Sequence, residues 1–143
     1  MDPELFVMPV NIRYLEVDQQ GVVFNMWYLA YFDDALSAFL EANGLPYQTM
    51  LDAGFDVMLV HTELDWRGGA RWQDDVGVAV SLARLGRSSF TLDFRVTANG
   101  AAIVEGRTVY VCVGTDGSGK RDIPELLRTA LGEERPLRGP AGP

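Results

Sequence analysis

One segment of helical periodicity constrains the fold of this chain more than any other feature. Between Trp27 and Asn43, apolar side chains recur at steps of three and four, which is typical of a helix with one apolar face. These side chains are Tyr28, Tyr31 or Phe32, Ala35, Leu36, Phe39 and Leu40. Gly44 accepts a positive φ just after the helix, and Pro46 prevents its continuation. The chain therefore has one long helix whose apolar face must be buried against another layer.

The segments around this helix are rich in residues that favour β-strands. Leu5 to Glu16 predicts a first strand, in which Pro9 restricts pairing to a sheet edge or a bulge. A short helical turn follows the long helix in YQTMLDAG. Four further strands are then predicted, at Asp56 to Trp66, Val76 to Leu85, Ser88 to Ala98 and Ala101 to Gly114. Asn99 and Gly100 both accept positive φ, so they predict a tight hairpin between the last two strands.

This order of elements predicts an α+β fold, β-α-β4, in which a five-stranded antiparallel sheet curls around one long helix. Residues 1–132 are expected to form a single domain, closed by a short helix with Asp122 as its N-cap and Pro124 in its first turn. Residues 133–143 contain much Pro and Gly, so we expect a disordered tail. One helix leaves most of the other sheet face uncovered, and we therefore expect a homodimer or homotetramer.

Composition excludes several classes of function. The 143 residues suffice for one hydrophobic core, and a net charge of −8 argues against general binding to nucleic acid or to anionic membranes. Cys112 and His61 are the only residues of their kinds, so neither an internal disulfide nor a zinc site of the usual type is expected. The N-terminal stretch lacks the basic region of a secretory signal, and no apolar run reaches the roughly 18 residues that span a bilayer. We expect a cytoplasmic protein that needs no metal.

The stretch EVDQQGVVFNMWYLAYFDDA, residues 16–35, joins the first strand to the helix and contains the main candidate for chemistry. Asp18 precedes a turn that contains Gly21, and Asn25 lies where the helix starts and backbone N–H groups lack partners. If the turn folds Asp18 back toward this positive potential, the carboxylate stays ionised and the N–H groups can polarise a carbonyl. An Asp between a strand and a helix is also commonly a turn or capping residue. Spacing alone leaves both interpretations open.

Several motifs in the sequence resemble one family of enzymes. RYLEVDQQGVVFNMWYLAYFDDA is similar to the N-terminal motif of hot-dog-fold acyl-CoA thioesterases of the 4-hydroxybenzoyl-CoA thioesterase family. LDWRGGARWQDDV, RLGRSSFTLDFRV and GRTVYVCVGTDGSGKRDIPELLRTAL resemble later segments of that family in the same order. The resemblance covers Val10 to Leu131 and implies the hot-dog fold, thioester hydrolysis and an active site at a subunit interface.

The resemblance assigns roles to two residues. Asp18 matches the catalytic carboxylate, and the backbone N–H of Asn25 matches the donor that polarises the thioester carbonyl. Asp18 would either attack the carbonyl carbon or activate a water molecule, and the sequence leaves both routes open. Many members have His at the position of Asn25, and the usual Pro and Gly of the second motif are replaced by Gly69 and Gln73, while Asp74 is kept.

Further candidates for substrate binding follow from position. They are Gly21 in the turn, Trp27, Tyr28 and Tyr31 at the helix start, His61, Arg71, Arg87, Ser88 and Ser89. His61 is expected on one strand face with Val57, Leu59 and Glu63, as a structural residue or part of the pocket wall. The arginines, including Arg84, are candidates for the phosphates of coenzyme A, although exposed loop arginines are commonly only solvated.

Two alternative functions follow from the same pattern. One is a non-catalytic module that binds acyl-CoA or an acyl-carrier protein, and the other is a structural oligomerisation domain. Turnover of a thioester separates the enzyme from the binding module, and a ligand-dependent melting temperature separates the binding module from the structural domain. The sequence leaves open the acyl group and whether its carrier is coenzyme A or a protein.

Overall fold

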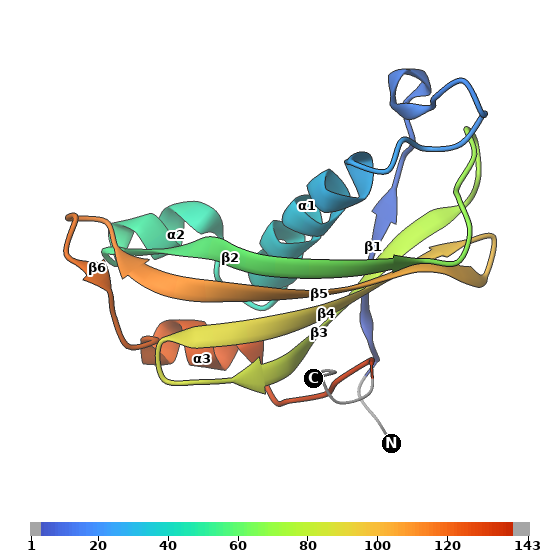
Figure 1. Cartoon of the computed structure of the whole chain (residues 1–143). Coiled ribbons are helices and arrows are strands. Elements are labelled where there is room, and N and C mark those ends of the chain that lie inside the picture. The colour runs from blue at the N-terminus through green and yellow to red at the C-terminus, as the bar shows by residue number, and fades with distance from the viewer. Residues whose placement is uncertain (1–3, 139–143) are drawn as a thin grey trace.

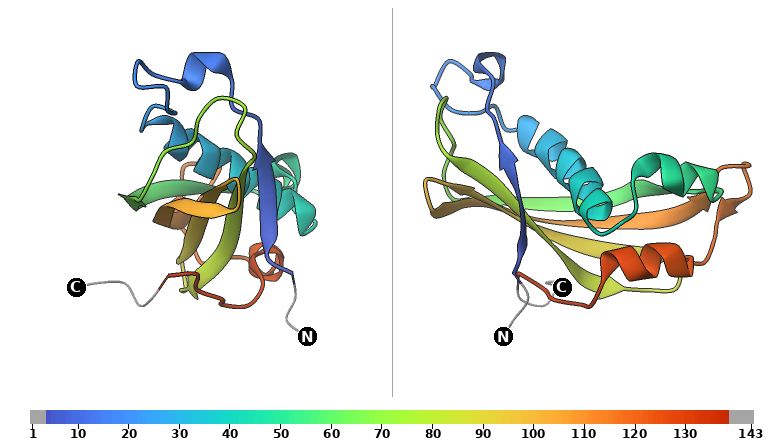
Figure 2. Two further views of the ribbon diagram at one scale, coloured as in Figure 1. Left: turned by 90° about the vertical axis from the view of Figure 1, so that its right-hand side faces the viewer. Right: turned by 180° about the vertical axis from the view of Figure 1, so that it is seen from behind.

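The helix α1 lies across a strongly curved antiparallel sheet (Figures 1 and 2). The computed structural model describes residues 4–138. Its strands are β1 (Phe6–Val10), β2 (Phe55–Trp66), β3 (Val76–Leu85), β4 (Ser89–Ala98), β5 (Ala101–Gly114) and β6 (Gly119–Lys120). Its helices are α1 (Trp27–Ala42), α2 (Tyr47–Asp52) and α3 (Glu125–Leu131), with a 3-10 turn at Tyr14–Glu16. The strand order is β1-β3-β4-β5-β2, and β6 pairs with β5.

The apolar face of α1 forms the core with the inner face of the sheet. Ala35 is fully buried, and Phe32 stacks on Phe94 of β4 with ring centroids 4.5 Å apart. The Phe32 ring occupies the space where a side chain at Gly106 would begin, with its Cε2 2.4 Å from the position of a Cβ atom there. These contacts confirm the predicted architecture of one long helix enclosed by one curled antiparallel sheet.

The start of the chain differs from the sequence-based prediction. The strand predicted from Leu5 to Glu16 ends at Val10, and Tyr14–Glu16 form a 3-10 turn instead. Pro9 of β1 lies opposite Gly77 of β3. β1 is an edge strand, as expected for a strand that contains proline, which has no backbone N–H to donate. The sheet also contains a sixth strand, β6, whose two residues were not predicted.

A β-bulge in β2 changes which residues face the core. Leu59 lies opposite the buried Tyr110, whereas His61 lies opposite Val109, the next residue along β5. Because adjacent residues of a strand face opposite sides, the bulge at Val60 places His61 on the other face from Leu59. The prediction that these two share one face is therefore wrong.

The C-terminal segment packs on the sheet. The predicted tail begins at residue 133, but Arg135 donates its N–H to the Leu82 carbonyl at 2.6 Å, and Leu137 donates its N–H to Asp93 at 2.9 Å. Disorder is thus contradicted for residues 133–138, while residues 139–143 lie outside the described part. The N-cap of α3 is Pro124, whereas the sequence predicted Asp122.

None of the helices within residues 4–138 combines the length and the apolar character needed to cross a membrane.

Candidate active site

Asp18 lies in a closed loop that leads directly into the start of α1. The Asp18 N–H donates to the Val22 carbonyl at 2.9 Å, Val17 forms a bridge with Val23, and the Phe24 N–H donates to the Glu16 carbonyl at 2.9 Å. These contacts pair the two arms of the loop like a short hairpin. The sequence-predicted Asp18 and Asn25 are therefore brought to the same loop, because Asn25 follows Phe24 directly.

The loop orients the Asp18 carboxylate. Its Oδ1 accepts the Gln20 N–H at 2.8 Å, and its backbone carbonyl accepts the Gly21 N–H at 3.0 Å. Gly21 has a φ of 80°, which a residue with a side chain adopts only with strain. Within residues 4–138, Oδ2 of Asp18 forms no hydrogen bond. One oxygen thus fixes the orientation and the other remains available for chemistry.

The start of α1 offers unpaired N–H groups. Met26 is the N-cap and provides no side-chain cap, and the backbone N–H of Asn25 bonds to no acceptor in the described part of the chain. Because the helix dipole adds positive potential there, an electron-rich oxygen is stabilised at this point. This end of α1 can therefore hold a carbonyl oxygen or an oxyanion.

A cavity of about 390 Å³ opens at this helix end. It is lined by Val22, Val23, Asn25, Tyr28, Trp66, Gly68 and Gly69. The loop between β2 and β3 approaches it closely, since the Val23 N–H donates to the Ala70 carbonyl at 2.8 Å. The Ala70 N–H donates to the Tyr28 hydroxyl at 3.1 Å, and burial raises the pKa of Tyr28. Asp18 belongs to the adjoining loop and not to the lining of this cavity.

Arg71 lies beside the Asp18 loop. Its Nη1 is 3.3 Å from the position that a Cβ of Gly21 would occupy, so the guanidinium covers the turn. The Arg71 N–H donates to Asp74 at 2.7 Å, which fixes the backbone that carries this side chain. The structure thus brings Arg71 to Gly21 in the Asp18 loop, while Tyr28 shares the lining of the cavity with Asn25.

Trp27 and Tyr31 do not line the Asn25 cavity, although the Tyr31 ring contacts the ring of Tyr28, with centroids 5.8 Å apart. They line a second cavity of about 370 Å³, next to β1, together with Arg13 and Glu16. The Arg13 guanidinium lies over the Trp27 ring, with its Cζ 5.4 Å from the ring centroid. Tyr31 donates its hydroxyl hydrogen to Glu16 at 2.7 Å. A direct contact of these two aromatic residues with a substrate in the Asn25 cavity is not supported by this arrangement.

Glu16 is the residue of this region that sequence reasoning missed. It is 4% exposed, and it accepts hydrogen bonds from the Arg13 Nε at 2.8 Å, the Arg13 N–H at 3.1 Å and Tyr31. Burial alone would raise the pKa of Glu16, but the hydrogen bonds from Tyr31 and Arg13 outweigh it and hold that pKa below its ordinary value. Burial, followed by the bond to Glu16, raises the pKa of Tyr31 far above its usual range. The pair is therefore a carboxylate and a neutral phenol.

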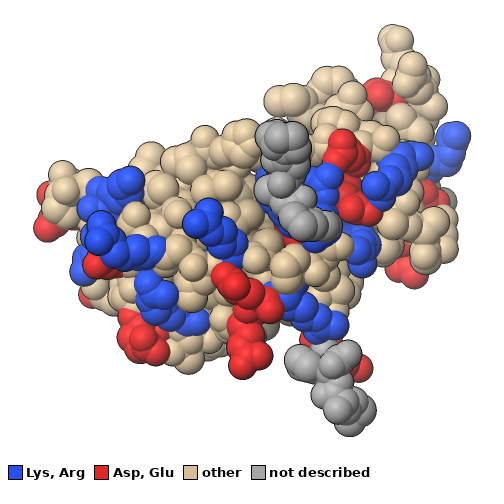
Figure 3. Space-filling model, turned by 60° about the horizontal axis from the view of Figure 1, so that its bottom comes forward, with Lys and Arg blue, Asp and Glu red and all other residues tan. Residues whose placement is uncertain are grey.

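The other predicted residues lie away from this end within one chain. Ser89 starts β4 opposite Val111, near the beginning of β2, whereas Trp66 at the far end of β2 lines the Asn25 cavity. Arg87 is exposed and 3.4 Å from Asp122, and the Ser88 carbonyl accepts the Cys112 N–H at 2.9 Å. Figure 3 shows Lys and Arg interspersed with Asp and Glu over one face of the molecule, without a continuous basic surface.

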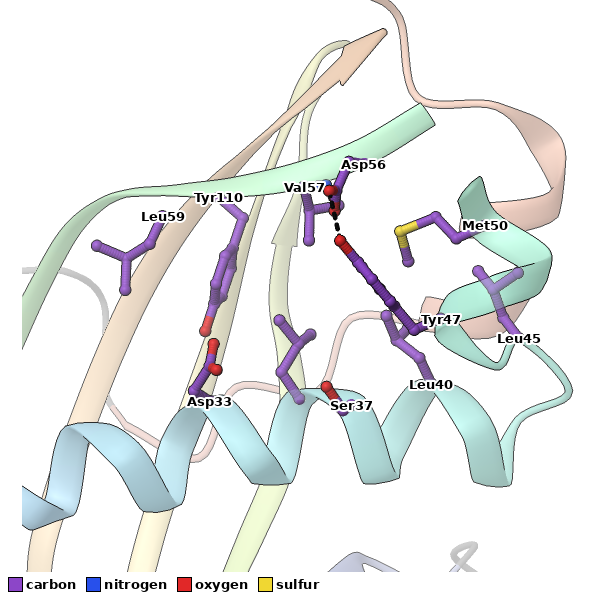
Figure 4. Close-up of a pocket in the computed structure, with 11 residues that line it drawn as sticks. Asp33, Ser37, Leu40, Leu45, Tyr47, Met50, Asp56, Val57, Leu59 and Tyr110 are labelled. Atoms are coloured by element: carbon purple, nitrogen blue, oxygen red, sulfur yellow. Dashed lines mark hydrogen bonds between the residues drawn. The ribbon is translucent and has the colours of Figure 1, made fainter. Parts of the chain in front are cut away.

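A third cavity, of about 340 Å³, lies between the C-terminal half of α1, α2 and the sheet (Figure 4). Leu40, Leu45 and Met50 form much of its apolar wall. Tyr47 donates its hydroxyl hydrogen to Asp56 at 2.7 Å, and the Tyr110 hydroxyl points toward Asp33. The lining of this cavity therefore combines an apolar wall with carboxylate and hydroxyl groups.

The acidic side chains do not converge elsewhere in a way that suits a cation. In residues 4–138, no cluster of three or more His, Cys, Asp or Glu side chains has the arrangement of a metal site.

Comparisons with known proteins place this geometry in a family. The model of the thioesterase-like superfamily matches residues 12–131. A hypothetical protein of Thermus thermophilus with a crystal structure is 34% identical, with a TM-score of 0.82 over 90% of this chain and 97% of that chain. A thioesterase of the same species, crystallised with coenzyme A and Zn, is 26% identical, with a TM-score of 0.74 over 87% and 90% of the two chains.

A curated relative agrees with this placement. The 1,4-dihydroxy-2-naphthoyl-CoA hydrolase of Synechococcus elongatus is 25% identical over 122 residues, which are 84% of this chain and 90% of that protein. The described sheet and helix have the same hot-dog fold as the similar structures. The match over most of its length shows that the chain belongs to the thioesterase-like superfamily, and it is a thioesterase of the hot-dog fold.

Proposed function

We propose that this chain hydrolyses acyl-CoA thioesters to a free acid and coenzyme A, as its resemblance to the 4-hydroxybenzoyl-CoA thioesterase family implies. The observation that carries the proposal is the paired loop that contains Asp18 and leads into the uncapped start of α1, where Asn25, whose N–H is unpaired within the described residues, lines a cavity. Similar proteins named as an acyl-CoA hydrolase and as a thioesterase crystallised with coenzyme A support the substrate class.

In the proposed reaction, the Asn25 N–H donates a hydrogen bond to the thioester carbonyl oxygen. This bond strengthens as negative charge develops on that oxygen in the transition state. Asp18 then acts in one of two ways. It attacks the carbonyl carbon and expels the thiolate of coenzyme A, which leaves a mixed anhydride that water hydrolyses, or it takes a proton from the water that attacks. Only protein groups take part, and coenzyme A enters with the substrate.

The acyl group is proposed to extend along α1. Tyr28 lines the Asn25 cavity and Asp33 lines the third cavity, and these residues are five positions apart on one helix. At a rise of about 1.5 Å and a rotation of about 100° per residue, Asp33 lies about 8 Å further along the axis and about 140° around the helix from Tyr28, so the acyl group would pass partly around α1. Leu40, Leu45 and Met50 in the lining of the third cavity support an acyl group with a hydrophobic part.

The enzyme is proposed to act as a homodimer that pairs through β2. Among the described strands, β2 pairs only with β5, and Met58, Leu59 and Val60 near its middle are more than half exposed. A two-fold axis places the same strand on both sides of the interface, and the two copies of β2 would run antiparallel. This arrangement would bring Arg87, Ser88 and Ser89 of a second copy to the end of the sheet where Asn25 lies.

That geometry supports a role of the second copy in binding coenzyme A. Ser89 lies near the start of β2, and Trp66 lies at its end. Antiparallel pairing of two copies of β2 would therefore place Ser89 of one copy near the Trp66 end of the other. Arg71 of the first copy and Arg87 of the second are the proposed partners of the phosphates. A cytoplasmic location is part of the proposal, and it is supported by the single cysteine and its burial.

The test is free-thiol release from a panel of aliphatic and aromatic acyl-CoAs, measured on the wild type and on Asp18→Asn. We expect the substitution to lower kcat by at least about a hundredfold, since it removes the base or nucleophile but keeps the size of the side chain. Asp52→Asn on α2 is the matched control, because Asp52 is exposed and lies outside all three cavities, and it should keep full turnover. Turnover that is indifferent to Asp18 would contradict the proposal.

The two routes are separated by a single-turnover reaction in water enriched in ¹⁸O. If Asp18 is the nucleophile, the water that hydrolyses the anhydride can leave ¹⁸O in the Asp18 carboxylate, and mass spectrometry of the peptide detects it. A general base gives label only in the released acid, and so does a nucleophile if water attacks the acyl carbon of the anhydride, so ¹⁸O in Asp18 is the result that identifies the nucleophile. The same measurement on Asp52 provides the background.

A further inference from the structure

Glu16 connects the two parts of the proposed active site. Its carbonyl accepts the Phe24 N–H at 2.9 Å and so closes the base of the loop that contains Asp18. Its side chain accepts the Tyr31 hydroxyl at 2.7 Å and so binds the same loop to α1. The loop carries the carboxylate, and the helix start carries the Asn25 N–H. Glu16 therefore contacts both the element that holds Asp18 and the helix that positions Asn25.

Both carboxylate oxygens of Glu16 accept hydrogen bonds. Oε1 accepts Tyr31 and the Arg13 N–H, and Oε2 accepts the Arg13 Nε at 2.8 Å. A buried carboxylate is tolerated only when it is hydrogen-bonded and paired in this way. Loss of its charge would weaken the hydrogen bond from the Tyr31 hydroxyl and remove the ion pair with Arg13, so we expect the loop to be held less firmly against α1.

Another buried carboxylate, that of Asp93, has a purely structural role in the same molecule. Asp93 is also buried and is paired with Arg107 at 2.7 Å, but it lies on β4 and contacts the C-terminal segment. Asp93 thus stabilises the fold at a distance from the loop. Glu16 differs because its partners belong to the elements that present Asp18 and Asn25.

We propose that Glu16 is a positioning residue of the thioesterase site, which acts through Tyr31 to hold the Asp18 loop in register with the Asn25 N–H. This inference rests on the proposed function. A displacement of reacting groups by about 1 Å lowers a rate by up to about a hundredfold. Glu16 itself touches no substrate in this arrangement, so its loss affects the chemical step more than substrate binding.

The test compares Glu16→Gln, Tyr31→Phe and the double variant in thiol-release assays, with rates expressed per folded molecule. Each single variant should lower kcat between about ten- and a hundredfold and leave KM within about twofold. The double variant should lose no more than the more damaged single variant, because Tyr31→Phe removes the hydrogen bond that Glu16→Gln weakens by removing the charge of its acceptor. The amide hydrogen of Phe24, measured by hydrogen exchange, should exchange faster in all three variants.

Asp93→Asn is the matched control, since it removes the charge of a buried carboxylate that is paired with an arginine elsewhere. It should lower the denaturation midpoint but keep the wild-type kcat per folded molecule. If Glu16→Gln does not fold, Tyr31→Phe decides alone, because it leaves the bonds between Glu16 and Arg13 in place.

The outcomes separate this inference from the proposed function. Loss of turnover in Asp18→Asn with unchanged kcat in both Glu16→Gln and Tyr31→Phe would overturn only the role of Glu16. Losses that multiply in the double variant, or a rise in KM without a fall in kcat, would also overturn it. A wild type that releases no thiol from any acyl-CoA would overturn the proposed function and the positioning role together.

Discussion

Gln73 holds the backbone in the left-handed region, with a φ of 74°. This conformation favours glycine, because a Cβ atom crowds the following carbonyl oxygen. The family that the chain resembles usually has Gly in this segment, and the structure explains why a glycine suits the position. The loop that carries Arg71 and Asp74 therefore contains local strain.

Gln73→Gly is expected to stabilise the protein by up to about 1 kcal/mol, since it relieves the left-handed strain at the expense of a more flexible unfolded chain. The same substitution at Gln48 is the control. Gln48 lies in α2, where glycine should destabilise by about 1 kcal/mol. Urea denaturation measures both changes. A lower midpoint for Gln73→Gly would show that the contacts of the Gln73 side chain add more to the free energy of unfolding than its backbone strain subtracts.

Asp93 gives the stability of the fold a defined dependence on pH. It is fully buried and accepts two hydrogen bonds from Arg107, at 2.7 and 3.0 Å. Burial alone would raise the pKa of Asp93, but the bonds from Arg107 and from the N–H groups of Arg138 and Leu137 hold that pKa below its ordinary value of 3.8. A carboxylate with a lowered pKa stabilises the folded state above the ordinary value, and this contribution is lost as pH falls below it.

Asp93→Asn should therefore destabilise the protein by about 3–5 kcal/mol near neutral pH, because Arg107 is left buried without a charged partner. The difference from the wild type should shrink once the pH falls below the ordinary value of 3.8, because the unfolded wild type then binds a proton that the folded state takes up only at lower pH. Urea denaturation on both sides of this value measures the change, with the exposed Asp34→Asn as control. A difference that does not shrink below this value would contradict the assignment.

The sequence indicates Asp18 but gives little sign of Glu16. Glutamate is mostly exposed in proteins, so a lone Glu two residues before Asp18 predicts a solvated side chain. Its burial depends on Tyr31, fifteen residues further along the chain, and on the direction in which α1 turns that side chain. The spacing of Arg13 and Glu16 was the one local hint, because the two residues form an ion pair at this separation. Positions that depend on such tertiary contacts were not predictable from local patterns.

At the scale of elements, the β4–β5 hairpin shows where local sequence is sufficient. Asn99 and Gly100 have φ values of 52° and 87°, as the predicted turn requires. No atom lies within 4 Å of the position that a Cβ of Gly100 would occupy, so packing does not restrict this residue. Its preference for glycine comes from the backbone alone.

Gly100→Val should destabilise the protein by about 1–2 kcal/mol, since a β-branched residue is strained at positive φ. Ala101→Val is the control, because Ala101 is exposed and begins β5, where a β-branched residue is favoured. Thermal denaturation of the two variants measures the contrast. Equal melting temperatures would show that the hairpin adopts another turn.

Other elements were predicted only in part, for reasons of tertiary pairing. The boundaries of α1, β3 and β5 follow from periodicity and turn residues and agree with the prediction within one residue. The first strand was predicted too long because Asn11 to Glu16 has strand-like composition but no partner strand among the described residues. The bulge in β2 reverses the face of His61, and alternation in the sequence contains no sign of it.

At the scale of the whole molecule, the proposed site and Arg71 lie at one end of the sheet, whereas the other proposed coenzyme A residues, Arg87, Ser88 and Ser89, lie at the other end. Asn25 and Trp66 line one cavity, whereas Ser89 lies near the start of β2. A second copy that pairs antiparallel through β2 would resolve this separation. Both sheet edges are exposed in the described chain, since the strand order begins with β1 and ends with β2. The two edges therefore provide a test of which one is the interface.

Val60→Lys on β2 should convert the dimer to a monomer and abolish most of the thioesterase activity, because a charged side chain on an edge strand opposes pairing with another strand. Val7→Lys on β1 is the matched control. Val7 is 51% exposed and Val60 is 54% exposed, so both variants place the same charge at a similarly exposed valine of an edge strand. Sedimentation velocity measures the assembly, and thiol release measures the activity. If β2 is the interface, Val7→Lys remains a dimer with wild-type turnover. A Val60→Lys protein that is still dimeric would show that the dimer assembles through another surface. A Val60→Lys protein that is monomeric and fully active would show that the active site is complete within one chain.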